Sequence, residues 1–183
     1  MYTGDNRAAQ LSQQLIGDAM LTLLQTAAFS EISVSALCRE AQVSRQTFYT
    51  LFGTKESVLT YLLQNSCCFA PEKKTACRSA DFRMFCQGYS RYIIRKRHIL
   101  ELLVRNEMMH CLYDVQYESI MGCADFMQGV TGDDRLYLID FIASGMNSIA
   151  KNYVITGCHA DEAFLEQLMY RLFGGIYFHS EER

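Results

Sequence analysis

The stretch over residues 43–56, VSRQTFYTLFGTKE, constrains the fold of this chain more than any other. Its apolar residues Val43, Phe48, Leu51 and Phe52 recur at helical spacing, which predicts a short helix with one buried face. A serine at position 44 can cap this helix, because its hydroxyl accepts bonds from free amide groups. The other face carries polar side chains suited to base edges and phosphates: Arg45, Gln46, Thr47, Tyr49 and Thr50.

A second short helix is predicted directly upstream, over residues 33–41, with Ser33 or Ser35 as its cap. Two short helices separated by a tight turn are typical of a helix-turn-helix, whose second helix enters the major groove of DNA. Gly53 and Thr54 then interrupt the chain, and a longer helix begins near Lys55. Helix starts attract anions, so we expect Lys55 to contact a DNA phosphate.

These residues resemble the DNA-binding domain of TetR/AcrR-type transcriptional regulators. The family pattern is VS-x-x-T-[hydrophobic]-Y-x-x-F-x-[ST]-K-E-x-[LV], and the positions that match are Val43, Ser44, Thr47, Phe48, Tyr49, Phe52, Thr54, Lys55, Glu56 and Val58. Two positions depart from it. Leu51 stands where members usually carry His or Tyr, which removes a phosphate contact. Ala28 stands where a Gly is common, and alanine tolerates a left-handed helix end less well, at about 1 kcal/mol.

The resemblance covers about the first third of the chain and implies an all-α protein. It implies a three-helix helix-turn-helix domain over residues 1–55 and a larger helical ligand-binding and dimerisation domain over residues 56–183. It also implies a homodimeric repressor that binds a palindromic operator in double-stranded DNA and is released by a small-molecule effector. The predicted DNA contacts are Ser33, Ser44, Arg45, Gln46, Thr47, Tyr49, Thr50 and Lys55.

The first long helix is expected over residues 7–27, after six residues that are disordered or form a short arm. Its apolar residues at helical spacing predict the inner stripe Leu11, Leu15, Ile16, Ala19, Leu23 and Ala27. Further helices are expected over residues 56–69, 81–96, 99–104, 106–128, 135–156 and 161–173, the last ending before Gly174 and Gly175.

In the resembling family, the last two long helices pair with those of a second subunit. The stripes that would form this interface here are Leu136, Ile139, Ala143, Met146, Ala150, Leu165, Leu168 and Leu172. Small residues such as Gly145 would let the helices approach closely. The alternative is that these stripes face only the core of the chain itself.

Members of the family often bind a small molecule among the middle helices. Aromatic, methionine and cysteine side chains make adaptable apolar cavities. The candidates to line one are Phe85, Tyr89, Tyr92, Met108, Cys111, Tyr117, Met121 and Phe126. Ordinary core packing is the alternative for each, since an aromatic stripe looks the same around a ligand or against a neighbouring helix.

Charge alone does not indicate a nucleic-acid binder, because the net charge is −3. DNA affinity depends strongly on neutralising phosphates. The placement of Arg45 and Lys55 at the expected DNA contacts outweighs the negative net charge. The small number of such cations still predicts modest DNA affinity for one subunit, and hence a dimer. The alternative is a helical interaction protein of the same fold that acts through a protein partner.

The eight cysteines and four histidines show neither C-x-x-C nor H-x₃₋₅-H spacing, so we expect no metal site and no cofactor. Most thiols are expected to be buried, with Cys67, Cys68 and Cys77 as candidates for oxidant sensing. Motifs of an enzyme are absent from the sequence. It also lacks a membrane-length apolar run and a signal peptide, which predicts a cytoplasmic protein with no membrane contact.

Overall fold

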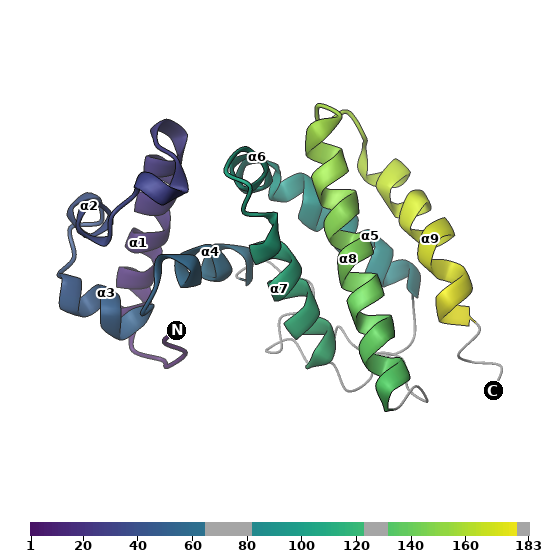
Figure 1. Cartoon of the computed structure of the whole chain (residues 1–183), viewed down its shortest axis with the longest axis horizontal. Helices are drawn as coiled ribbons and strands as arrows, with labels where there is room; N and C mark the ends of the chain where they lie inside the picture. Colours follow the sequence, from purple (N-terminus) through teal and green to yellow (C-terminus); the bar gives the residue numbers. More distant parts are fainter. Residues whose placement is uncertain (65–81, 123–131, 179–183) are drawn as a thin grey trace. The chain divides into compact units, whose positions relative to one another are not determined.

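The computed structural model describes residues 1–64, 82–122 and 132–178, and in these ranges the regular structure is helical (Figure 1). This confirms the all-α prediction with an N-terminal helix-turn-helix. The chain divides into two compact units, residues 1–65 and 66–183. The fourth helix packs with the first unit, so the structural division lies later than the predicted boundary after residue 55. That boundary stays a prediction about function.

The first unit is built on α1 (Arg7–Thr26), the long helix drawn in dark purple in Figure 1. Three shorter helices pack against it. They are α2 (Val34–Glu40), α3 (Arg45–Leu51) and α4 (Lys55–Gln64), and the 3-10 turn η1 (Phe29–Glu31) joins α1 to α2. Each short helix contributes buried apolar side chains, which hold it in place although it is too short to be stable alone.

The buried face of α1 differs from the predicted stripe. Leu11 and Leu15 are 58% and 43% exposed, so their expected place in the core was wrong. The buried side instead includes Gln13 and Gly17. A methyl group at Gly17 would lie 3.0 Å from Leu62 Cδ2, so the missing side chain lets α4 approach α1. A prediction based on the spacing of large apolar residues does not identify Gln13 or Gly17 as buried.

Two backbone positions shape the connections that follow α1 and α2. Gln42, between α2 and α3, has a φ of 55°, and the Val43 amide donates to Cys38 O at 3.0 Å. This is the left-handed helix ending that usually carries glycine. Ala28 has a φ of −69° and a ψ of 147°, which any residue adopts. The expected left-handed penalty at Ala28 is therefore absent.

The second unit contains α5 (Phe82–Arg95), α6 (Arg97–Arg105), α7 (Met109–Met121), α8 (Asp133–Ile155) and α9 (Glu162–Phe178). α8 packs against α6 and α7, and α5 packs against α9 (Figure 1). The predicted helix from residue 106 begins later, because Glu107 adopts a φ of 58° and separates α6 from α7. A similar turn after α8 places Cys158 at a φ of 59°.

The last helix runs through Gly174 and Gly175, where the sequence predicted an end. A glycine in a helix interior costs only about 1 kcal/mol of stability, and a helix that is anchored by packing tolerates this cost. Gly145 on α8 accommodates this helix, since a methyl group there would lie 2.8 Å from the Phe173 ring. Its small size serves packing inside the unit. No helix within the described ranges is apolar over a length that would cross a bilayer.

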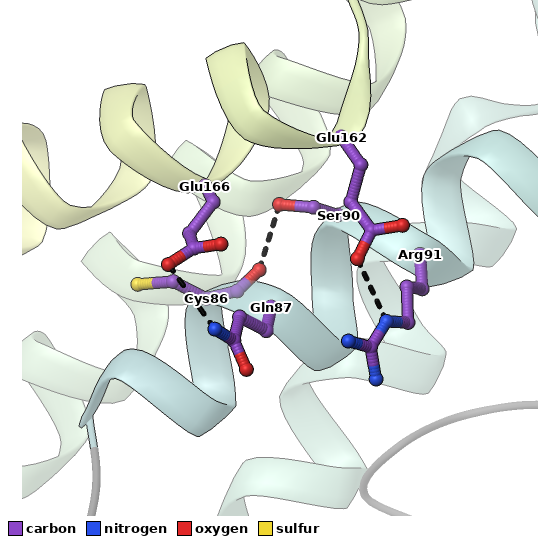
Figure 2. A network of polar contacts seen from close by, with 6 residues as sticks. All are labelled: Cys86, Gln87, Ser90, Arg91, Glu162 and Glu166. Carbon is purple, nitrogen blue, oxygen red and sulfur yellow. Dashed lines mark hydrogen bonds and ion pairs between the residues drawn. The ribbon is translucent and has the colours of Figure 1, made fainter.

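Polar contacts along one seam join α5 to α9 (Figure 2). Arg91 Nε lies 2.7 Å from Glu162 Oε1, and Gln87 Nε2 donates to Glu166 Oε1 at 3.4 Å. The Cys86 thiol is buried beside Glu166 (Figure 2), and burial raises its pKa to about 12, with a further rise from the Glu166 carboxylate. Exposed ion pairs contribute only about 0–1 kcal/mol to stability, so apolar packing holds the two helices together. The polar contacts of the seam instead fix the register of α5 against α9.

Candidate nucleic-acid interface

The helix α3 is anchored by its apolar side. Phe48 and Leu51 are buried, and the Phe48 ring lies 6.1 Å from the Phe52 ring. Phe52 in turn meets Tyr61 of α4 edge to face, with centroids 5.5 Å apart. Leu51 therefore belongs to the core of the first unit, and a leucine in place of His or Tyr strengthens this anchor.

The opposite side of α3 presents polar groups to solvent. Arg45, Gln46, Tyr49 and Thr50 are exposed, and their spacing along the helix puts them on one face. The Tyr49 ring also packs edge to face on Phe48, with centroids 5.4 Å apart, so the ring is held in place while about half of the residue stays exposed. The structure thus gathers four of the predicted DNA contacts on one surface, which we call the α3 polar face.

Three other predicted contacts have hydroxyls that serve the helix starts. Ser33 Oγ accepts a bond from the Ala36 amide at 3.1 Å, and Ser44 Oγ accepts one from the Thr47 amide at 3.0 Å. The Ser44 and Thr47 hydroxyls also lie 2.8 Å apart. Ser33 and Ser44 are the caps of α2 and α3, as the sequence predicted. Replacing either serine by alanine would cost about 1 kcal/mol of stability before any DNA contact is considered.

Lys55 has a different environment from the one expected. Its ammonium group donates to Phe29 O at 2.9 Å and to Ile32 O at 2.6 Å. The same nitrogen lies 4.6 Å from the centroid of the Phe29 ring. These contacts tie the start of α4 to the connection between α1 and α2. Whether Lys55 also reaches a phosphate stays a prediction.

The Cys38 thiol lies beneath the start of α3, 4.0 Å from Ser44 O. Burial raises its pKa, and the nearby Arg45 guanidinium acts in the opposite direction. Cys38 therefore stays protonated at neutral pH and acts as a core residue, because the thiolate is the reactive form. The proposed oxidant sensors Cys67, Cys68 and Cys77 lie outside the described residues.

The predicted dimer stripes lie mostly inside the second unit. Buried within it are Ile139, Ala143, Met146, Ala150 and Leu165. Leu168 is half-buried, and only Leu136 and Leu172 are exposed. A side chain that is already enclosed by its own unit has no surface left for a partner. Five of the eight predicted interface residues are thus core residues, whereas Leu136 and Leu172 remain available to a partner.

A different apolar surface is exposed on these two helices. Its large side chains, which we call the α8–α9 apolar face, are Leu136, Tyr137, Phe141, Ile155, Phe164 and Leu172. An open hollow of about 650 Å³ lies along α8 among Tyr137, Phe141 and Ser144. Sequence periodicity missed Tyr137 and Phe141, because both stripes of α8 are apolar and only packing shows which one is covered.

The predicted ligand-pocket residues fall into two groups. Tyr89, Tyr92 and Cys111 are buried, and the Tyr89 and Tyr92 rings stack with centroids 5.7 Å apart. Phe85, Met108 and Tyr117 are half-buried and Met121 is exposed, whereas Phe126 lies outside the described residues. The structure brings Tyr89 and Tyr92 together on α5, and Cys111 is buried on α7.

Gln116 on α7 completes a polar pair in this core. Its side-chain amide donates to the Tyr89 hydroxyl, which donates to Met146 O at 3.0 Å. Gln116 is buried, and its Oε1 has no hydrogen-bond partner among the described residues. A buried acceptor without a donor costs about 1–3 kcal/mol. Sequence reasoning missed Gln116, since a single glutamine on a helix gives no signal of burial.

Residues 16–62 match the sequence model of the bacterial regulatory proteins of the tetR family. The chain is also similar to a protein from Lactococcus lactis, the HTH-type dhaKLM operon transcriptional activator DhaS. The two are 36% identical over 55 residues, which is 30% of this chain and 29% of DhaS. The alignment therefore spans less than a third of either protein.

Two solved structures share the fold over nearly the whole chain. The protein Lin0861 from Listeria innocua superimposes with a TM-score of 0.79 at 16% identity, covering 96% of each chain. The TetR family repressor AlkX from Dietzia sp. superimposes with a TM-score of 0.57 at 18% identity, covering 91% of this chain and 97% of AlkX. At these identities the likeness establishes the fold alone.

Proposed function

We propose that this protein, whose residues 16–62 match the sequence model of the tetR family of bacterial regulatory proteins, is a sequence-specific DNA-binding transcriptional regulator. The observation that carries the proposal is the α3 polar face. Arg45, Gln46 and Tyr49 stand exposed on a helix whose other side is buried, and packing gives no reason for these residues there. In a helix-turn-helix, this is the face that enters the major groove.

The side chains suggest how sequence would be read. Arg45 would bind guanine O6 and N7 with two bonds, and Gln46 would bind adenine in the same manner. Thr47 and Thr50 would touch thymine methyl groups or phosphates. Tyr49 and the capping residues Ser33 and Ser44 would bind phosphates, and such contacts fix the register of the protein on the duplex.

Selection of binding sites from random duplex DNA tests this proposal. The winning site is then titrated at two salt concentrations beside a scrambled duplex. We expect a two-fold symmetric site with strong preference over the scrambled sequence. Absence of enrichment would contradict the proposal and would favour the alternative, a helical interaction protein that acts through a protein partner.

Arg45→Ala should weaken binding to the selected site by about 1–3 kcal/mol and relax the preference at one base pair. The matched control is Arg39→Ala, which removes an equally exposed charge from α2 in the same unit. Repeating the selection with both variants separates loss of charge from loss of base reading. An unchanged site preference in Arg45→Ala would contradict its role.

We also propose that the protein is a homodimer joined through the α8–α9 apolar face. Exposed large apolar side chains, such as Tyr137 and Phe141 beside the hollow on α8, often mark a protein interface when they gather on one surface. A two-fold dimer uses the same surface on both subunits and matches a palindromic operator. The net charge of −3 supports a dimer, because one subunit offers few phosphate contacts and two DNA-binding units would double their number.

The buried Gln116 suggests what the regulator would respond to. An apolar core in which the Gln116 Oε1 acceptor lacks a partner suits a small molecule that carries a hydroxyl or amine donor. We propose that such an effector releases the protein from its operator and that the protein acts as a repressor.

Thermal shifts with a panel of small alcohols and amines, compared between wild type and Gln116→Leu, test the site. A reporter placed behind the selected site distinguishes repression from activation.

A further inference from the structure

Residues 1–6, expected to be disordered or a short arm, lie against the end of α3. The Tyr2 amide donates to Leu51 O at 2.7 Å, where α3 ends. The carbonyl of the same residue accepts a bond from Gln13 Nε2 at 2.9 Å. Gln13 is only 4% exposed and lies on α1. One backbone unit, that of Tyr2, thus joins α1 to the last residue of α3.

The arm also closes on itself. The Tyr2 hydroxyl accepts a bond from the Asn6 amide at 3.3 Å, and Asn6 Oδ1 caps α1 by accepting from the Ala8 amide at 2.9 Å. A methyl group on Gly4 would lie 2.4 Å from the Tyr2 hydroxyl oxygen, so the ring covers this glycine closely. The short loop therefore has a defined shape that begins and ends on α1 and α3.

The end of α3 is where such support has an effect. A helix leaves its last carbonyl groups without partners inside the helix, and α3 has only seven residues. The Tyr2 amide supplies a donor to one of these carbonyls. Tyr49 and Thr50, which belong to the α3 polar face, directly precede Leu51. Whatever fixes the Leu51 carbonyl also fixes the orientation of these two side chains.

We propose that residues 2–6 form an N-terminal hook that holds the C-terminal end of α3 in its DNA-reading position, and that Gln13 is the positioning residue that holds the hook. This inference rests on the DNA-binding function proposed above. It explains why an amide is buried on α1 at a position where an apolar residue would pack equally well. The hook touches no DNA in this account and acts through α3.

The test replaces the donor while keeping the volume. Gln13→Met removes the bond to Tyr2 O, and Gln14→Met on the exposed side of α1 is the matched control. The chain contains no tryptophan, so Thr3→Trp at an exposed position supplies a single fluorescent reporter in the hook and leaves Tyr2 in place. We expect high anisotropy of this reporter alone and with Gln14→Met, and a fall when Gln13→Met is added.

Operator affinity is measured on the selected site at a temperature where each variant is folded. Gln13→Met should lose about fivefold in affinity, as for one lost hydrogen bond, and Gln14→Met should match the wild type. The ratio of specific to scrambled binding should fall with it, which a general loss of stability would not produce. Deletion of residues 2–5 should reproduce the loss without altering α1.

Each negative result would overturn a different part of the account. Equal affinities of Gln13→Met, the deletion variant and wild type would overturn the inference while the regulator function stands. A reporter that stays rigid in Gln13→Met would show that another group holds the hook and would overturn the role of Gln13. Failure of the wild type to select any DNA site would overturn the proposed function itself, and with it the role of the hook.

Discussion

Ala143→Asp should unfold the second unit, whereas Phe141→Asp should leave it folded and convert the proposed dimer into monomers. Ala143 is 0% exposed on the inner side of α8, and a carboxylate placed there without a partner costs about 4 kcal/mol or more. Phe141 is 58% exposed on the α8–α9 apolar face, so its replacement removes interface area and leaves the core intact. The two variants place the same charge two residues apart.

Thermal denaturation by circular dichroism and light scattering after gel filtration separate the two effects. Ser148→Asp, at an exposed position on α8 that does not line the hollow, controls for charge on the helix surface. A folded Ala143→Asp dimer would mean that this side of α8 is not enclosed in solution. Persistence of the Phe141→Asp dimer would place the interface on another surface.

Lys55→Met should lower the stability of the first unit by about 3 kcal/mol. Each hydrogen bond to a charged group contributes about 1.5–3 kcal/mol, and Lys55 makes one to Phe29 O and one to Ile32 O. Methionine keeps most of the aliphatic length but donates nothing. Chemical denaturation measures the loss, with the adjacent exposed Glu56→Met as the matched control.

The same variant decides whether Lys55 contacts DNA. A lysine that neutralises a phosphate contributes about 0.9 to the slope of log affinity against log salt concentration. With the ammonium group engaged by two carbonyls, we expect the slope of Lys55→Met to equal that of the wild type at a temperature where both are folded. A slope lowered by about 0.9 per subunit would instead support the predicted phosphate contact.

The sequence was most informative where two independent signals coincided. In α3 the spacing of Phe48 and Leu51 predicted the buried side, and the capping preference of Ser44 predicted the first residue. Both come from local backbone chemistry, and the structure confirms the helix and its cap. The α3 polar face follows from these two, because a seven-residue helix with one buried side has one side left.

Sequence was less informative where burial is decided by a distant segment. On α1, Leu11 and Leu15 look like core residues, but they face solvent because the helix turns Gln13 and Gly17 inward. The reasons lie elsewhere in the chain: Tyr2 O accepts the bond from Gln13, and Leu62 occupies the space beside Gly17. A periodic pattern on one helix contains neither piece of information.

The long helices of the second unit show a related difficulty. α8 carries apolar residues on both sides, so its periodicity is compatible with two orientations. Ala143 faces inward and Phe141 outward only because α6 and α7 cover one side. The expected dimer stripe was therefore the core stripe. Lys55 is a similar case, since the carbonyl groups that it binds are brought to it by tertiary structure.

Among the described residues, the non-glycine positions with a left-handed backbone are Gln42, Glu107 and Cys158, and these have a consequence for how such a regulator evolves. A side chain in this backbone region carries roughly 1 kcal/mol of strain that glycine would relieve. Selection for heat tolerance would be expected to fix glycine first at positions 107 and 158, which lie in the second unit. Position 42 joins the two helices that meet DNA. A lineage that keeps glutamine there while the other two become glycine would reveal that its side chain is used in operator recognition.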